Sequence, residues 1–432
     1  MDWELVDAPA ETSVAVKFGG PACERPPRGH RYEVRIIGMG LNLVLAGNTT
    51  LRAAGQCFLI TEQTATPSFW TIRTWVLRLG LYELRRAKPR ANDWVFIVDA
   101  TIAVGQHKAL VILGARLDDM RQHGFNLGHQ DVAILELAIL TRCDGLTVQA
   151  QLEAAAQAVG VPRAVVSDGG SDVKRGVRLF AEAHPGVVWF YDLTHRLACL
   201  LERELGEYWW WPDFLKQAGQ CRQACQQTVW SHLMPPAQRT KARWFNLEPI
   251  IRWALRVVAY GRRHRLESRQ FAILFGWLTA FEERLREARQ LVVMMKAVCV
   301  PIKAKGINAA RVDRCARRIA KIAQTERSRA FGRQIIEFLR EQAAQVKPGE
   351  TMLASSDVIE SLFGKYKAIV ERSPMNAMTV MVLQVAAITS ERTPDVIREA
   401  METVSMADVN GWFEANGEPT LLAKRRAALK DY

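Results

Sequence analysis

Residues 163–195, RAVVSDGGSDVKRGVRLFAEAHPGVVWFYDLTH, are the stretch on which the fold of this chain depends. An apolar run at 164–166 is followed by Ser and Asp168 and then by two glycines, after which a helix is expected. A second apolar run at 187–191 ends at Asp192. A short branched apolar run with glycine close behind it is typical of a buried parallel strand and a tight strand-to-helix turn. The stretch therefore predicts strand, helix and strand, with carboxylates at the sheet edge where open α/β sheets bind ligands.

Three more apolar runs and an amphipathic helix precede this stretch. The runs are WVFIVD at 94–99, ALVIL at 109–113 and ILELAIL at 134–140, and the helix is expected at 147–159. The resulting order is strand, strand, strand, helix, strand, helix, strand, which is that of the ribonuclease-H-like fold. Asp99 closes the first strand and Asp168 the fourth, so the sequence predicts an α/β core with a mixed sheet that carries two acids at strand ends.

Composition favours a polyanionic partner. The chain has 432 residues, is 49% hydrophobic and 24% charged, and carries a formal net charge of +13 with a pI near 9.5. An excess of positive charge of this size favours nucleic acid through phosphate neutralisation and long-range steering. The eight cysteines are scattered, and core packing of Cys221 and Cys225 is favoured over a metal site. No apolar leader or run of about 18 apolar residues is found. We expect a cytoplasmic, DNA-associated protein without a membrane partner.

The N-terminal region predicts a flexible arm over 1–30 and a helix-turn-helix domain over 31–90. Three short helical patterns, at 32–45, 51–60 and 69–80, are joined by capping residues and tight turns. The third helix is expected to face outward through Thr71, Arg73 and Thr74 and inward through Trp70, Ile72, Trp75, Val76 and Leu79. Arg85, Arg86, Lys88 and Arg90 follow as a basic linker suited to a phosphate backbone. The alternative is a three-helix packing domain with a solvated basic face.

The long helical segment at 206–348 is predicted to be a domain inserted into the α/β core. The core itself is expected at 91–205 and 349–395, followed by a helical, basic tail at 396–432. Between 303 and 333 the insertion carries ten Lys or Arg residues against two acids. Arg311, Arg314, Arg318 and Lys321 fall on one helical face, which suits DNA phosphates, although a solvated helix face has the same pattern.

An aromatic residue in the insertion has two readings as well. Trp244 lies among Arg239, Lys241 and Arg243, where an aromatic ring could stack on a base flipped out beside a cut. A core tryptophan in a helical bundle is the favoured interpretation, because tryptophan is heavily buried on average. The run Tyr208-Trp209-Trp210-Trp211 is expected in a core or an interface.

Three carboxylates form the candidate site. Asp99 and Asp168 follow strands, and Glu360 lies near the start of the helix expected in SSDVIESLFGKYKAIV at 355–370. Three such carboxylates can hold two divalent cations ~3.5–4 Å apart, and oxygen ligands favour Mg²⁺ or Mn²⁺. This pattern indicates phosphodiester cleavage and strand transfer. Each acid also has a structural interpretation, as a turn or helix cap for the two aspartates and as a capping box with Asp357 for Glu360.

Together these residues resemble the Asp-Asp-Glu triad of cut-and-paste DNA transposases, with a helical insertion before the Glu as in the hAT group. Asp192-x-x-His195 is similar to the Cys/Asp-x-x-His signature that follows the second Asp in several such families, although a histidine here is also often structural. Glu360 and Lys367 reproduce the spacing of insertion-sequence transposases, whereas Leu353 and Ser356 stand where a Tyr and an Arg often occur.

The resemblance implies an Mg²⁺-dependent enzyme with two ions per active site, which binds the terminal inverted repeats of a mobile element, cuts the ends and joins them to target DNA. It also implies at least a homodimer on DNA. The alternatives are a ribonuclease-H-like endonuclease or resolvase without strand transfer, and a non-catalytic regulator descended from a transposase. Asp172 is the competing second ligand, but its place beyond two glycines predicts a first-turn helix position instead.

Overall fold

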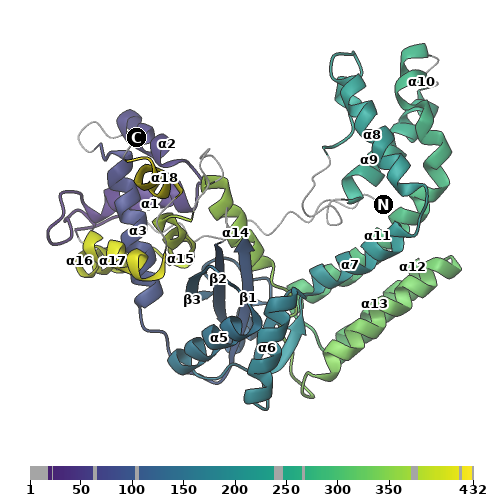
Figure 1. Ribbon diagram of the computed structural model, residues 1–432. Coiled ribbons are helices and arrows are strands. Elements are labelled where there is room, and N and C mark those ends of the chain that lie inside the picture. The colour runs from purple at the N-terminus through teal and green to yellow at the C-terminus, as the bar shows by residue number, and fades with distance from the viewer. Residues whose placement is uncertain are drawn as a thin grey trace. The chain divides into compact units, whose positions relative to one another are not determined.

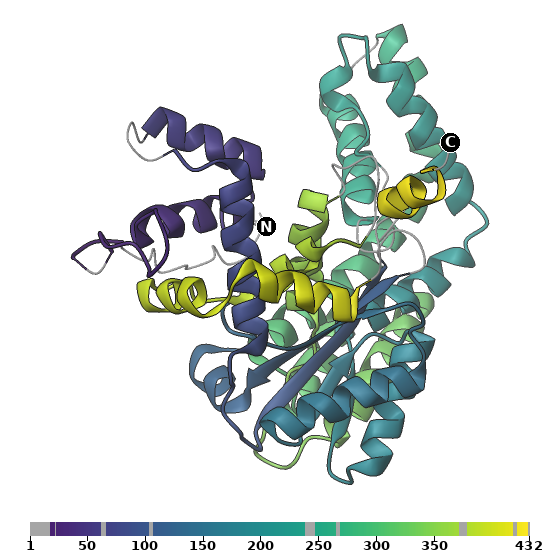
Figure 2. The ribbon, with the colours of Figure 1, turned by 60° about the vertical axis from the view of Figure 1, so that its left-hand side comes forward.

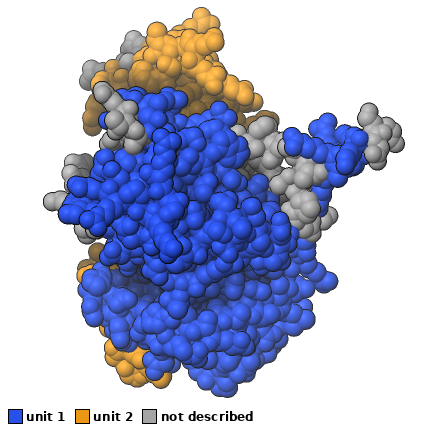
Figure 3. Space-filling view, turned by 90° about the vertical axis from the view of Figure 1, so that its left-hand side faces the viewer, with its two compact units in different colours: residues 1–190, 356–432 blue, residues 191–355 orange. Residues whose placement is uncertain are grey.

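The computed structural model describes residues 18–21, 23–61, 66–102, 107–237, 247–264, 268–370, 378–417 and 421–430. The chain forms two compact units, coloured separately in Figure 3. The first joins 1–190 to 356–432, and the second is 191–355. The sequence placed the insertion at 206–348, so the second unit extends further at both ends than expected.

The first unit is built on a five-stranded mixed sheet with the order β3-β2-β1-β4-β5 (Figure 1). The strands are β1 (Trp94–Ile102), β2 (Lys108–Arg116), β3 (Ala133–Leu140), β4 (Ala164–Ser167) and β5 (Val188–Tyr191). β1 pairs antiparallel with β2 and parallel with β4, and β2 pairs antiparallel with β3. The five strands follow one another along the chain as the sequence predicts, with apolar runs forming β1 to β3 and the glycine turn following β4.

Two helices cover one face of the sheet. α5 (Gly145–Val159) and α6 (Ser171–Ala183) bury Val148, Leu152 and Phe180 against Phe96, Val98 and Val165 of the sheet. The two helices approach closely at Gly176, where a Cβ atom would lie 2.5 Å from that of Val148. α14 (Asp357–Val370) packs against β1 and contributes nothing to that core, and Figure 1 shows it on the other side of the sheet.

Two details of the core differ from the sequence prediction. β1 continues to Ile102 instead of ending at Asp99, because antiparallel pairing with β2 runs along its whole length. A short helix, α4 (Leu117–His123), also lies between β2 and β3. Asp99 is therefore inside β1, although it lies beyond the last residue that pairs with β4.

A helical part of the first unit combines both ends of the chain. Its elements are α1 (Val34–Leu45), α2 (Leu51–Thr61), α3 (Phe69–Arg85), η4 (Val380–Leu383), α15 (Gln384–Thr389), α16 (Pro394–Thr403), α17 (Met406–Asn416) and α18 (Leu421–Ala428). α15, α16 and α17 all pack against α3, and Figure 2 shows the yellow α16 and α17 beside α3. At Gly80 of α3 a Cβ atom would lie 2.1 Å from the Leu383 carbonyl oxygen, so only glycine permits this approach.

The three N-terminal helices form close to where the sequence predicts them, and their caps explain their limits. The Thr50 Oγ1 accepts a hydrogen bond from the Ala53 amide at 3.0 Å, and Ser68 caps α3 by accepting from the Thr71 amide at 3.2 Å. The prediction that Trp70 is buried is wrong, because its side chain is 61% exposed at the first turn of α3. The described part of the expected flexible arm also packs, with Cys23 buried and the His30 Nε2 2.9 Å from the Met401 carbonyl oxygen.

The second unit is helical apart from the single bridge between Ile307 and Met352, within the ranges that are described. Its helices are α7 (Leu193–Gly206), α8 (Trp211–Cys225), η1 (Ser231–Leu233), α9 (Leu247–Arg263), α10 (Arg269–Phe275), η3 (Gly276–Phe281), α11 (Glu282–Lys305), α12 (Ala309–Ile322) and α13 (Glu326–Ala344). Trp210, Trp211 and Phe214 pack in its core beside Cys221 and Cys225, whereas Trp209 is 78% exposed. No helix in the described ranges of either unit is long and apolar enough to cross a membrane.

Candidate active site

Asp99 and Asp168 lie side by side at the edge of the sheet. The last register pair between parallel β1 and β4 is Val98 with Ser167, and each aspartate is the next residue along its strand. Neighbouring strands are about 4.8 Å apart, so the pairing places the two Cα atoms at the same level of adjacent chains. The alignment is a property of the backbone register and needs no particular side-chain rotamer.

Side-chain alternation places Asp99 on the face of the sheet away from the core. Phe96 and Val98 belong to the core under α5 and α6. Successive side chains of a strand point to opposite faces, so Asp99 projects to the other face. Asp168 directly follows Ser167, the last residue of β4. Because α14 packs on β1 and none of its described residues belongs to that core, Asp99 and the helix that bears Glu360 belong to one side of the sheet.

Both aspartates also bond to their own backbone neighbours. The Ala100 amide donates to the Asp99 Oδ1 at 2.6 Å, and the Gly170 amide donates to the Asp168 Oδ1 at 3.1 Å. Gly170 directly precedes α6, so Asp168 closes the turn that the sequence placed there. Both residues are half-buried, with part of each side chain open to solvent. The turn role and a ligand role are compatible, because a carboxylate has two oxygens and about four acceptor positions.

A residue pair that the sequence did not single out fixes the end of β4. Ser167 is fully buried, and its hydroxyl accepts a hydrogen bond from the Trp189 Nε1 on β5 at 2.9 Å. This bond ties β5 to the residue directly before Asp168. Trp189 belongs to a run that the sequence predicts as an apolar strand. Only the N–H donor of its indole indicates that the residue needs a hydrogen-bond partner.

Asp172 occupies the position expected of the competing acid. It lies in the first turn of α6, and its Oδ2 is 3.8 Å from the Lys108 Nζ. A negative charge there also interacts favourably with the helix dipole. The structural role assigned to Asp172 from the sequence therefore agrees with its surroundings.

Glu360 is in the first turn of α14, as expected, and is exposed. Its amide donates to the Ser356 carbonyl oxygen at 3.4 Å, and Ser356 is buried. Lys367 lies two turns further along the same face, half-buried, with its Nζ 6.0 Å from the centre of the Phe363 ring. In the described part of the chain no group of three or more His, Cys, Asp or Glu side chains is arranged to hold a metal ion. The sheet alone thus aligns two of the three acids, and the third depends on α14.

Asp192 and His195 act together as a helix cap in the second unit. The Asp192 carboxylate is 1% exposed and accepts a hydrogen bond from the His195 amide at 2.6 Å, which makes Asp192 the N-cap of α7. The Leu193 amide donates to the Ala354 carbonyl oxygen at 2.9 Å. The spacing of the Asp-x-x-His signature is therefore that of an N-cap and the third residue of its helix.

The residues predicted to read DNA from α3 are half-buried. Ser68 and Thr71 bond to each other through their hydroxyls at 3.0 Å, and the Thr74 hydroxyl donates to the Trp70 carbonyl oxygen at 3.0 Å. The Arg73 guanidinium lies 5.7 Å from the centre of the Trp70 ring, and burial lowers the pKa of Arg73. Thr71, Arg73 and Thr74 of α3 are thus less exposed than the sequence predicts.

Most residues of the basic linker form hydrogen bonds or ion pairs within the first unit. Arg85 is exposed, but the Arg86 Nη2 lies 3.0 Å from the Glu83 Oε1. Lys88 donates to the Glu83 and Leu84 carbonyl oxygens, and burial lowers the pKa of Lys88 to about 8. Arg90 donates to the Gln157 carbonyl oxygen of α5 at 2.5 Å.

The predicted basic stripe on α12 is exposed at three of its four positions. Arg314, Arg318 and Lys321 are exposed, whereas Arg311 is half-buried and donates to the Gly306 carbonyl oxygen at 2.6 Å. The opposite face of α12 is buried through Val312, Cys315 and Ile319, as expected. Four predicted DNA contacts lie outside the described residues: Arg239, Lys241, Arg243 and Trp244.

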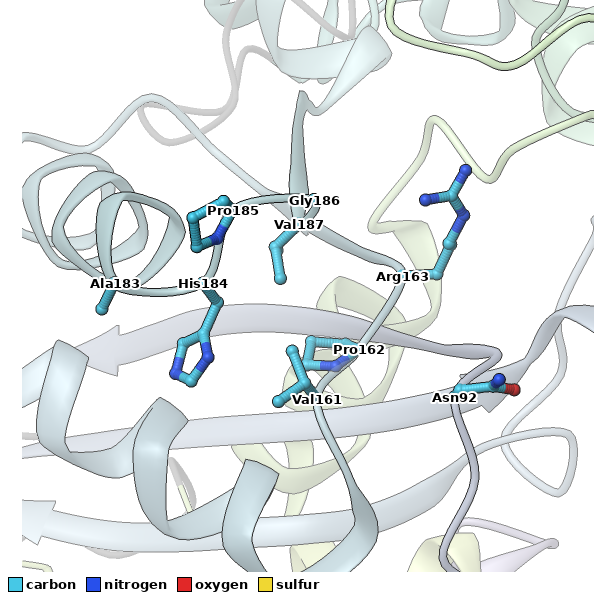
Figure 4. Close-up of a pocket in the computed structure, with 9 residues that line it drawn as sticks. All are labelled: Asn92, Val161, Pro162, Arg163, Ala183, His184, Pro185, Gly186 and Val187. Atoms are coloured by element: carbon cyan, nitrogen blue, oxygen red, sulfur yellow. The ribbon is translucent and has the colours of Figure 1, made fainter.

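A cavity of about 380 Å³ lies at the opposite edge of the sheet, where β1, β4 and β5 begin. Its lining includes Asn92, Arg163 and His184 (Figure 4). The His184 Nε2 is 2.9 Å from the Glu153 Oε2, and the Arg163 side chain extends away from His184 in Figure 4. Because the two aspartates lie at the other ends of β1 and β4, this cavity is separate from the candidate active site.

Comparisons with known proteins give a likeness in structure but none in sequence. No protein-family model matches the chain, and no curated protein matches its sequence. Among solved structures, the chain is similar to one described as a Drosophila P element transposase strand transfer complex. The identity is 12% and the TM-score 0.45, over 86% of this chain and 94% of that chain.

Proposed function

We propose that this protein is a DNA transposase with an Asp-Asp-Glu active site formed by Asp99, Asp168 and Glu360. The observation that supports this most strongly is the register of the two aspartates, one residue past the last pair of two parallel strands. Two carboxylates placed next to the last pair of parallel strands can bind one cation together, and this ligand role is compatible with the turn role of Asp168. The succession of strands and helices along the chain, from which the sequence predicts a ribonuclease-H-like core, also supports the proposal.

The donor set suits divalent magnesium or manganese. All three residues offer carboxylate oxygens, which these hard cations prefer, and the two aspartates are half-buried yet reachable from solvent. Two bound ions would activate a water or a 3′-hydroxyl and stabilise the leaving oxygen of an in-line displacement. The protein's own part is to fix Asp99 and Asp168 through the sheet, to bring Glu360 on α14, and to hold the phosphodiester against this edge.

The partners we propose are the terminal inverted repeats of a mobile element and a target DNA. The net charge of +13 supports a polyanionic partner, and the exposed Arg314, Arg318 and Lys321 of α12 provide a row of cations for phosphates. Paired cutting requires two ends held together, so we propose a homodimer or a higher oligomer on DNA. Lys367 would then support the site through the position of α14 rather than by contact with the reacting atoms, and Asp192 and His195 would support the start of α7.

The test is to incubate the full chain with the DNA that flanks its gene in the presence of Mg²⁺ and to map the products. The proposal expects cuts at a pair of inverted repeats and joining of the freed 3′-ends to a second DNA. Cuts without joined products would favour a ribonuclease-H-like nuclease or resolvase. Sequence-specific binding with no cut in either Mg²⁺ or Mn²⁺ would favour a non-catalytic DNA-binding regulator.

A further inference from the structure

A buried histidine lies against the helix that carries Glu360. His129 belongs to the loop between α4 and β3 and is 8% exposed. Its Nε2 lies 3.1 Å from the Oγ of Ser361, the residue that directly follows Glu360. The two residues are 232 positions apart in the sequence, so no local pattern indicates the contact.

Two hydrogen bonds within the loop hold the backbone around His129 in place. The Gly128 amide donates to the Asp131 Oδ2 at 2.7 Å, and the Asp131 amide donates to the Gly128 carbonyl oxygen at 3.2 Å. His129 is inside this closed turn, which limits its backbone freedom. The turn leads directly into β3, an outer strand of the sheet, so His129 is positioned by the same sheet that aligns the aspartates.

Glu360 needs a support of this kind. Asp99 and Asp168 are aligned by backbone pairing, but Glu360 is exposed in the first turn of a helix. Rotation of α14 about its axis by one residue position, about 100°, would move the Glu360 carboxylate to another side of the helix. A hydrogen bond to the neighbouring residue from outside the helix opposes that rotation. Ser361 is itself exposed, so the buried partner is the histidine.

We propose that His129 is a positioning residue for the active site, which sets the rotation of α14 through Ser361 and so places the carboxylate of Glu360. The inference rests on the proposed function, because it assigns Glu360 a metal-binding role. It goes beyond that function in naming a residue outside the triad and outside every motif of the sequence.

The experiment uses the full chain and compares His129→Ala, His129→Gln and Ser361→Ala with the wild type. Three quantities are measured for each: the melting temperature, the rate of DNA cleavage, and the Mn²⁺ concentration that gives half of the maximal rate. Loss of a residue that orients a metal ligand typically costs ~10–100-fold in metal affinity or activity. We expect His129→Ala and Ser361→Ala each to raise the half-maximal Mn²⁺ concentration by about tenfold or more, and the double variant to add little. The glutamine amide can replace the Nε2, so His129→Gln should recover most of this loss.

The matched control is His184→Ala. It removes the hydrogen bond between His184 and Glu153, which is also part-buried and lies in the first unit, at the opposite end of the strands. It should change the melting temperature without moving the Mn²⁺ requirement. If His129→Ala behaves like this control, or if activity falls only in proportion to the folded fraction, the inference is wrong. Wild type that does not cut, or an active Glu360→Ala, overturns the proposed function and the inference with it. An inactive Glu360→Ala beside an unshifted His129→Ala overturns the inference alone.

Discussion

The sheet edge and the N-terminal helices of the first unit are stabilised in opposite ways. Asp99 and Asp168 are placed by the pairing of β1 with β4 in a sheet whose strands all lie between 94 and 191, and the turn after β4 is closed by the Gly170 amide two residues later. α3, in contrast, is packed by helices from the far end of the chain, with Tyr82 bonded to Glu399 and Gly80 against Leu383. Single substitutions at the site on the sheet should thus leave the sheet folded, whereas α3 should not fold without the C-terminal helices.

The largest expected effect concerns the sheet edge. Asp99→Ala and Asp168→Asn should each lower Mg²⁺-dependent cleavage by about a thousandfold or more, since a lost ligand removes several kcal/mol of transition-state stabilisation. Removal of one of two adjacent negative charges should leave the melting temperature close to that of the wild type. The measurement is single-turnover cleavage of a terminal DNA fragment.

Asp172→Asn is the control for that pair of variants. It has a helix-dipole position and an ion pair with Lys108, so it should cost stability of ~0.3–1 kcal/mol and retain substantial activity. An active Asp168→Asn beside an inactive, well-folded Asp172→Asn would reverse the assignment of the second ligand.

The second prediction separates the N-terminal helices from their partners. A fragment of residues 31–90 should be largely unfolded, because the faces of α3 that bury Leu79 and Tyr82 would lose α15 and α16. Joining the fragment to residues 378–417 should restore helical circular dichroism and a cooperative thermal transition. A folded, cooperative 31–90 fragment would show that α1 to α3 are an independent domain after all.

The third prediction concerns the close approach within that helical part. Gly80→Ala should destabilise the chain by about 1–3 kcal/mol, since its Cβ would lie 2.1 Å from a backbone oxygen that cannot move aside easily. Gly411 of α17 has no atom within 4 Å of its Cβ position, so Gly411→Ala should instead stabilise by about 0.5–1 kcal/mol. Urea unfolding of both variants shows whether each substitution lowers or raises the free energy of unfolding. Equal stability of Gly80→Ala and the wild type would mean that α3 and η4 are further apart.

The smallest expected effects are on the basic face of α12. Arg314→Ala and Arg318→Ala should weaken binding to all DNA sequences alike and reduce the salt dependence of binding, with stability unchanged. Arg311→Ala should lower the stability of the second unit as well, because its guanidinium bonds to carbonyl oxygens at the end of α11. Salt titrations of DNA binding, combined with melting curves, distinguish a phosphate contact from a solvated face.

The sequence predicts what depends on neighbours in the chain and fails where distant segments meet. The strand runs and the glycine turn after Asp168 are local, and the sequence predicts both. The position of Trp70 was predicted from helical periodicity and is wrong, because the partners of α3 that decide which face is buried come from residues beyond 378. The contact between His129 and Ser361 has no local signal of any kind.

The most direct test of the proposed metal site is Mn²⁺ binding to the DNA-free protein, measured by isothermal titration for the wild type, Asp168→Asn and Asp172→Asn. We expect the wild type and Asp172→Asn to bind Mn²⁺ with similar affinity. Asp168→Asn should lose that binding, because Asp99 alone in the sheet is a weak ligand set. Unchanged Mn²⁺ binding by a folded Asp168→Asn would contradict the claim that the two strand residues form one metal site.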